Sequence, residues 1–184
     1  MPKAPPTSVP AEPVPKRPRF TFPKIKLPHL SQRAFVFDRP GDVRTVMRVL
    51  YLVFNEGYSG DVDLAAEAIR LTRQVAAVID HPEVAGLLAL MLLHHARRRA
   101  RRTADGGVVP LAAQDRSLWD TTMIAEGVEV LQRALARDQL GEYQAQAAIA
   151  ALHDDAARAE ETDWPQVLEW YDELLRLAPS PLVA

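Results

Sequence analysis

Five arginines lie within six consecutive positions near the middle of the chain. They are Arg97, Arg98, Arg99, Arg101 and Arg102. Guanidinium groups pair well with phosphate oxygens, so this candidate basic patch is typical of a nucleic-acid contact. Arginines at the end of a helix also complement its dipole and are usually solvated or paired with acids such as Glu126, Asp154 or Asp155. Because the chain is net acidic after its N-terminal segment, we expect a solvated or acid-paired cluster, with nucleic-acid binding as the alternative.

A second candidate is the sequence YLVFNEGYSG, residues 51–60. Asn55, Glu56 and Tyr58 gather at the end of a predicted helix, and Gly57 is expected to end that helix in the left-handed conformation. Polar side chains at such a place can bond the unpaired backbone groups of two adjoining helices. We therefore expect a helix junction with a buried polar network, and the binding of a partner or ligand is the alternative.

The third candidate is QDRSLWD, residues 114–120, which contains Asp115, Arg116 and Trp119. The tryptophan is expected to pack on the core with its indole N–H bonded nearby. This pattern favours a loop anchored on a helical body. Because Trp and Arg are the usual hot-spot residues of interfaces, a protein-binding role is the alternative.

Residues for catalysis or metal binding are sparse. His94 and His95 are adjacent on a predicted helix and point about 100° apart, so they cannot bind one ion together. The chain contains no HExxH motif, no glycine-rich phosphate loop and no GxSxG elbow. His29, His81 and His153 are expected to face solvent or cap helices. We expect no enzyme activity, no cofactor and no metal.

The elements that must position these residues are helices. Apolar residues recur at three- and four-residue steps in six segments. The predicted helices run over residues 40–56, from Asp61 or Asp63 onward, over 82–101, 118–138 and 142–158, and from an N-cap at Asp163 to Pro179. The third is apolar nearly all round from Val84 to Leu93, so it should be the central helix. Between the third and fourth helices, Asp105-Gly106-Gly107 predicts a turn and VVPL a short extended arm.

The N-terminal segment has a different composition. Residues 1–33 hold nine of the 15 prolines and a net charge of +6, which leaves −8 for the rest. We therefore expect a disordered tail over residues 1–39 and a helical domain over 40–184. A solvated linker is the expected role of the tail; an electrostatic arm and the relic of a truncated gene start are the alternatives. With no cysteine, no secretory signal and no apolar run long enough for a bilayer, we expect a soluble cytoplasmic protein.

Several blocks of the chain resemble one known family in order. They are YLVFNEGYSG, AIRLTRQVAAVIDHPEVAGLLALMLLHHARR, QDRSLWD, IAEGVEVLQRAL, YQAQAAIAALH and DWPQVLEWYDELLRLAPSPLVA. From Arg44 to Ala184 the chain resembles the C-terminal helical extension of bacterial extracytoplasmic-function RNA polymerase sigma factors. The resemblance implies an all-α bundle and a regulatory, protein-interaction role in transcription initiation. The implied partners are RNA polymerase or the sigma regions of full-length relatives. A free-standing helical adaptor without a transcriptional role is the alternative.

Two departures qualify what the resemblance implies. Nothing upstream of Asp42 resembles either sigma region, so we expect a chain that cannot bind promoter DNA alone. At the other end, Pro179-Ser180-Pro181 resembles the turn of a tetratricopeptide-like helix pair that stops after three more residues. A half-pair cannot cover its apolar face, so Val167, Trp170, Leu174 and Leu177 are expected to be partly exposed and the chain to self-associate through its C-terminal helix.

Overall fold

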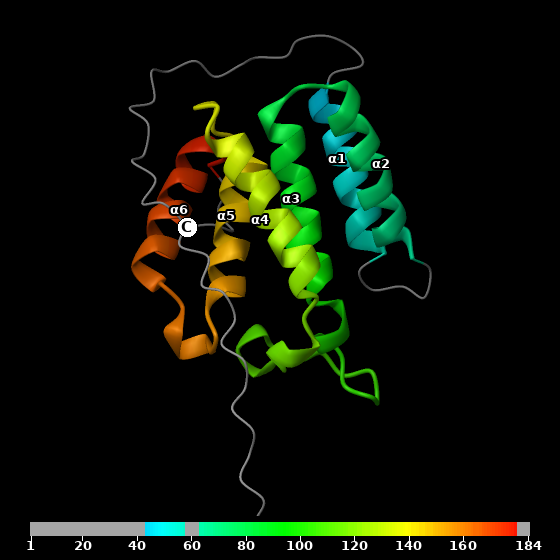
Figure 1. Cartoon of the computed structure of the whole chain (residues 1–184), viewed down its shortest axis with the longest axis vertical. Helices are drawn as coiled ribbons and strands as arrows, with labels where there is room; N and C mark the ends of the chain where they lie inside the picture. The colour runs from blue at the N-terminus through cyan, green and yellow to red at the C-terminus, as the bar shows by residue number, and fades with distance from the viewer. Residues whose placement is uncertain (1–42, 58–62, 180–184) are drawn as a thin grey trace, which may run out of the picture.

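The computed structural model describes residues 43–57 and 63–179, and it confirms the predicted all-α class. Six α-helices follow one another through these residues (Figure 1). They are α1 (Val43–Glu56), α2 (Leu64–Val78), α3 (Pro82–Ala96), α4 (Thr121–Leu135), α5 (Glu142–Asp155) and α6 (Trp164–Leu177). Short 3-10 turns occupy the connections at Arg98–Ala100, Leu111–Ala113, Arg116–Leu118 and Ala159–Glu161. Within the described ranges, no helix is both long enough and apolar enough to cross a membrane.

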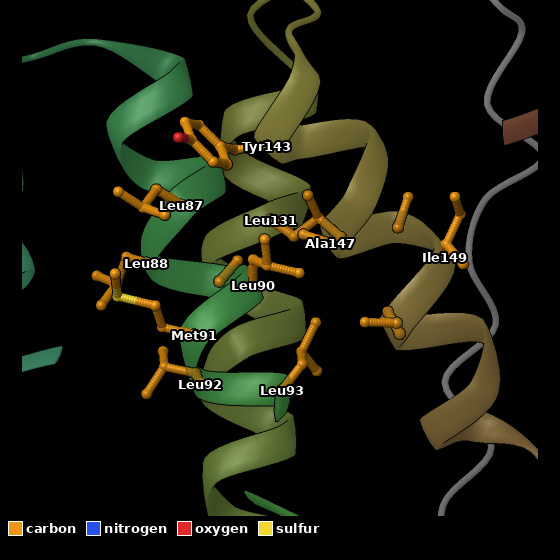
Figure 2. Packing of buried hydrophobic residues seen from close by; sticks show 14 of the residues in the cluster. Leu87, Leu88, Leu90, Met91, Leu92, Leu93, Leu131, Tyr143, Ala147 and Ile149 are labelled. Atoms are coloured by element: carbon orange, nitrogen blue, oxygen red, sulfur yellow. The ribbon is translucent and has the colours of Figure 1, made fainter. Parts of the chain in front are cut away.

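Helix α3 lies at the centre of the bundle, as its apolar composition predicts. It packs against α1, α2, α4 and α5, and its residues from Leu87 to Leu93 are all buried. Figure 2 shows Leu88 and Met91 pointing to one side of α3 and Leu90 and Leu93 to the other. Met91 faces α2, where its sulfur lies 3.4 Å from the Thr72 hydroxyl oxygen. A helix covered on several sides can be apolar around most of its circumference without exposing that surface to water.

Helices α3 and α5 run in the same direction. Their N-terminal ends meet at Gly86 and Gln144, and their C-terminal ends meet at Arg97 and Asp154. The antiparallel helix α4 packs against both, and α6 packs on α5 (Figure 1). The hairpin of α1 and α2 covers the other side of α3. The parallel α3–α5 pair therefore places two helix N-termini at one end of the bundle and two C-termini at the other.

The predicted starts of α2, α3 and α6 are confirmed, and a local side chain caps each of these helices. The Asp63 carboxylate accepts from the backbone N–H of Ala66 over 3.2 Å, and Asp163 accepts from Gln166 over 3.1 Å. The Nδ1 atom of His81 accepts from the Glu83 N–H over 3.1 Å, so this histidine caps α3 as expected. Such bonds satisfy backbone donors that have no partner inside the first turn.

Four predicted helix bounds are wrong, and one of them is the end of α4, which lies at Leu135 instead of Asp138. Helix α3 ends at Ala96 instead of Arg101, and the chain continues into the turn Arg98–Ala100. Helix α4 begins at Thr121 instead of Leu118, because Asp120 caps it and accepts from the Met123 N–H over 2.9 Å. Helix α5 ends at Asp155 instead of Arg158. The overextended ends of α3 and α5 lie beside arginines that bind terminal carbonyl groups, and the sequence pattern does not contain those contacts.

The predicted turn and extended arm after α3 form a small hairpin. Gly106 has a φ of 87°, the left-handed conformation that favours glycine. Backbone N–H groups of Thr103 and Val109 donate to the carbonyls of Gly107 and Arg101, over 2.9 and 2.7 Å. The hairpin therefore projects from the end of α3 and returns the chain toward residues 111–119.

Two glycines mark places where helices touch closely. The prediction of a left-handed Gly57 is wrong, because its φ lies outside that region. A Cβ atom on Gly57 would instead lie 2.2 Å from the Ala65 backbone nitrogen, at the start of α2. A Cβ atom on Gly86 would lie 2.6 Å from Cγ and 2.8 Å from the backbone nitrogen of Gln144. Both positions need glycine because a neighbouring helix occupies the space that a side chain would take.

The predicted exposed face of α6 is wrong for three of its four residues, and only Leu177 is partly exposed as expected. Val167, Trp170 and Leu174 are buried against the bundle. The large exposed side chains of α6 are instead Trp164, Leu168 and Tyr171. The sequence pattern reveals two apolar stripes on this helix but not which one packs on α5. The predicted tail, residues 1–39, and the expected turn at Ser180 and Pro181 lie outside the described residues.

The contact at Gly86 gives a test of the α3–α5 packing. Replacing glycine by alanine within a helix normally stabilises a protein by about 0.5–1 kcal/mol. We expect Gly86→Ala to destabilise this one by about 1–3 kcal/mol, because backbone atoms of α5 stand in the way. Urea denaturation followed by circular dichroism measures the difference. Gly127→Ala is the matched control: its Cβ would meet side-chain atoms of Leu93 at 3.0 Å and Leu92 at 3.3 Å and no backbone atom at shorter range, so its loss should be smaller. An equal or larger loss at Gly127 would contradict the packing described here.

Candidate functional site

The five arginines of the predicted basic patch do not form one surface. Arg97 is buried and Arg101 partly buried, whereas Arg98, Arg99 and Arg102 are exposed. Arg98 pairs with Asp63 at the start of α2 over 3.0 Å. The Arg102 guanidinium donates to the Gly106 carbonyl over 3.4 Å. Of the suggested acid partners, Asp154 pairs with Arg97, while Glu126 pairs with Arg73 instead.

The centre of the site is the buried carboxylate of Asp154 on α5. Arg97 Nη1 lies 3.4 Å from Asp154 Oδ1, and the two side chains are 8% and 0% exposed. Burial raises the pKa of Asp154 to about 7, and the positive charges of Arg97, Arg116 and Arg101 oppose that rise. Within the described residues, neither carboxylate oxygen accepts a hydrogen bond. The carboxylate is therefore held by the charge of surrounding guanidinium groups.

Trp119 joins the QDRSLWD segment to this carboxylate. Its ring is 4% exposed, with the Arg116 guanidinium carbon 4.3 Å and the Arg97 guanidinium carbon 6.0 Å from the ring centroid. The tryptophan packs on the core as predicted. Its indole N–H, however, has no acceptor among the described residues, which contradicts the expected hydrogen bond. Stacking of guanidinium groups on the ring face contributes through cation–π attraction.

Two arginines of the site bind the carbonyl groups at helix ends. Arg116 Nη1 donates to the carbonyls of His153 and Ala156, over 2.7 and 2.9 Å, at the end of α5. Arg101 donates to the carbonyl of His94 near the end of α3. Cations at these positions offset the negative ends of two parallel helix dipoles. We name Arg97, Arg101, Arg116, Trp119 and Asp154 the arginine–aspartate cluster. The hydrogen bonds and the ion pair of this cluster hold residues 97–119 against the C-terminal ends of α3 and α5.

Residues 42–135 match the family described as Family of unknown function (DUF6596). The chain belongs to this family. It is also 47% identical over 154 residues to Uncharacterized protein R00370 of Rhizobium meliloti (strain 1021), an alignment that covers 79% of this chain and 36% of the relative. The chain thus spans about a third of the length of that curated relative. No solved structure matches it.

The DUF6596 match contains only part of the cluster. It spans α1 to α4 and includes Arg97, Arg101, Arg116 and Trp119. Asp154, the carboxylate between the arginines, lies beyond the match on α5. If the matched segment stood alone, the apolar side of α3 that packs on α5 would be exposed to solvent. In this chain, the packed unit around the DUF6596 segment therefore extends at least through α5.

The other motif of the DUF6596 segment, at residues 55–58, lies at the junction of α1 and α2. Gly57 is buried there, but Asn55 and Glu56 are exposed, so the expected buried polar network does not involve these two side chains. Asn55 forms a side-chain hydrogen bond with Tyr51, one turn earlier, and burial raises the pKa of that tyrosine. Tyr58 lies outside the described residues. Asp115, the remaining predicted residue, caps a turn by accepting from the Ser117 N–H over 2.9 Å.

Sequence reasoning missed Glu83, which lies at the opposite end of the DUF6596 helix bundle. Its carboxylate accepts from the backbone N–H groups of Tyr143 and Gln144, over 2.6 and 3.3 Å, and so caps α5 from the first turn of α3. Burial raises the pKa of Glu83 to about 7, although these two bonds act to lower it. The available signal was Gly141, since a helix that begins after glycine has no capping side chain of its own.

The pairing of Arg97 with Asp154 can be tested by removing the cation. We expect Arg97→Ala to destabilise the protein by about 3–5 kcal/mol, because it leaves a buried carboxylate without its nearest counter-charge. The loss should be larger above the pKa of Asp154, since protonation relieves it at lower pH. Urea denaturation at two pH values measures both effects. Arg99→Ala, an exposed arginine of the same run, is the matched control and should change stability by less than about 0.5 kcal/mol. Equal losses for the two variants would contradict the cluster.

The raised pKa of Glu83 gives a pH dependence with a defined sign. The folded chain keeps a proton on Glu83 up to about pH 7, whereas an ordinary glutamate loses it near 4.5. Glu83 therefore contributes most stability below its ordinary pKa, and that contribution falls as the pH rises through 7. Glu83→Gln cannot ionise, so its stability relative to the parent chain should rise by roughly 1–3 kcal/mol between about pH 5 and about pH 8.

Thermal denaturation of both chains across this pH range makes the measurement. Glu129→Gln serves as the control because it makes the same chemical change at a side chain that is 70% exposed on α4. A constant difference between Glu83→Gln and the parent chain would show that Glu83 titrates like an exposed carboxylate.

Proposed function

We propose that this DUF6596 chain is an accessory protein-interaction domain of a sigma-factor-like protein linked to transcription initiation. The transcriptional half of the proposal rests on the ordered sequence blocks from Arg44 to Ala184 that resemble the helical extension of extracytoplasmic-function sigma factors. The chain spans about a third of a curated relative, which is consistent with a domain that acts as part of a longer protein.

The protein-binding half rests on the distribution of exposed apolar side chains. Nine large apolar side chains are exposed among the described residues, and six of them lie on α1 and α6. Large apolar surface grouped on two outer helices favours contact with protein. The arginine run adds less basic surface than its sequence suggests, since Arg97 and Arg101 turn toward Asp154. This distribution favours protein over nucleic acid as the partner and gives no support for binding of promoter DNA by the chain alone.

A free-standing helical adaptor with no transcriptional role is the second candidate. The same apolar faces on α1 and α6 favour it equally, because they bear on whether the chain binds protein and not on which protein it binds. The identity of the bound protein separates the two candidates.

Binding to the transcription machinery tests the proposal directly. We expect the purified chain to bind either bacterial core RNA polymerase or the separately expressed sigma regions of a full-length relative, measured by biolayer interferometry. Leu52→Glu and Leu168→Glu each add a charge to one apolar face, and the face that binds should lose about tenfold or more in affinity. Val78→Glu is the control, because Val78 is 85% exposed but lies on neither face.

A parallel measurement with DNA completes the test. Promoter and random duplexes should bind equally weakly and release with moderate salt, since contacts to phosphate alone carry no sequence preference. Binding to neither the polymerase nor the sigma regions would leave the adaptor as the better candidate. Promoter-specific binding at physiological salt would overturn the protein-interaction proposal.

A further inference from the structure

The outer face of α6 combines an apolar seam with negative charge. Trp164, Leu168 and Tyr171 are 53%, 62% and 39% exposed, and their spacing places them within an arc of about 60° on the helix. Asp172 and, further round the helix, Glu169 are exposed on one side of this seam, and the exposed Arg176 on the same side pairs with the buried Glu173. We call this surface, Trp164, Leu168, Glu169, Tyr171 and Asp172, the α6 face. It is narrow, apolar and bordered by acids on one side.

The outer face of α1 has a similar apolar content and the opposite charge. Val46, Val49 and Leu52 are 37%, 54% and 67% exposed at three-residue steps. Arg44 and Arg48 are also exposed on this helix, and its one acid is the last residue, Glu56. We call the surface of Arg44, Val46, Arg48, Val49 and Leu52 the α1 face. Each face therefore exposes three large apolar side chains, and the two faces differ in the sign of their charge.

The two faces belong to opposite sides of the bundle (Figure 1). Helix α1 packs on α2 and α3, whereas α6 packs on α5, so the faces cannot meet within one molecule. Two copies of the α6 face would bring acids against acids, and two copies of the α1 face would bring arginines against arginines. Juxtaposed like charges oppose both symmetric arrangements, while an α1 face against an α6 face brings opposite charges together.

We propose that a second copy of this chain docks its α1 face on the α6 face of the first. The contact is head-to-tail: it uses two different surfaces, so a dimer keeps a free α6 face on one molecule and a free α1 face on the other. Unless its rotation closes a ring, such a contact extends into an open chain. The proposal does not rest on a role in transcription, because it uses only the surfaces of this bundle.

Two variants and their mixture distinguish this arrangement from every symmetric one. Leu52→Glu disables the α1 face, and Leu168→Glu disables the α6 face. In sedimentation-velocity experiments up to about 1 mM, a range that covers weak association, we expect the parent chain to associate with concentration and each variant alone to remain monomeric. An equimolar mixture of the two variants should form dimers and nothing larger, because only one intact face of each kind remains in each pair. Val78→Glu, the surface control, should associate like the parent chain.

The other outcomes each overturn the proposal. Dimers of Leu52→Glu alone would indicate an α6–α6 contact, and dimers of Leu168→Glu alone an α1–α1 contact. A parent chain that stays monomeric over the whole range would show that another partner, or no partner, covers these faces. Binding of that monomer to the sigma regions would overturn this inference while leaving the proposed function intact.

The charges provide a second, independent measurement. Arg48→Glu should weaken association, and Glu169→Arg combined with Asp172→Arg should weaken it as well. Mixing these two charge-reversed chains should restore association to several times that of either alone, because opposite charges then face each other again. Failure of the mixture to recover would show that charge does not select the pairing.

Discussion

The architecture follows from one constraint: α3 is too apolar to expose any side. Its residues from Leu87 to Leu93 are all buried, so neighbouring helices must cover it around most of its circumference. Burial of apolar area is the dominant favourable contribution to folding, and here it is concentrated on a single helix. Four helices cover different sides of it: α1 and α2 as a hairpin, α4 antiparallel and α5 parallel. Close approach on two sides requires Gly86 and Gly127, which contact Gln144 and Leu93.

Placing α5 parallel to α3 creates an electrostatic problem that polar side chains solve at both ends. Two helix dipoles that point the same way add their positive ends at one end of the bundle and their negative ends at the other. Glu83 lies where the N-terminal ends meet, and it accepts from backbone N–H groups of α5. Arg101 and Arg116 lie where the C-terminal ends meet, and they donate to the terminal carbonyls. Side-chain hydrogen bonds to unpaired backbone groups therefore stabilise both ends of a parallel pair whose packing is set by apolar burial.

Whether a feature could be predicted from the sequence depended on how local its cause is. The number, order and class of the helices could be predicted because periodicity and caps such as Asp63 and Asp163 lie within each helix. The end of α3 could not be predicted, because it depends on the Arg101 guanidinium, which folds back and donates to the His94 carbonyl. Glu83 was missed because it caps a helix that begins about sixty residues later. On α6, periodicity identified both apolar stripes, yet only the packing against α5 buries Val167 and leaves Leu168 exposed.

The arginine run shows why charge in sequence and charge on a surface differ. A carboxylate as buried as Asp154 needs compensation, and the guanidinium groups of Arg97, Arg101 and Arg116 surround it. The arginines that turn inward no longer contribute to a basic surface, and Arg98 is paired with Asp63. What remains distinctive on the outside is the pair of apolar edges, one beside arginines on α1 and one beside acids on α6. Because the charges beside the two apolar edges have opposite sign, the bundle has two binding surfaces that differ in chemistry. That asymmetry, and not the arginine run, is the property from which specificity for a protein partner can arise.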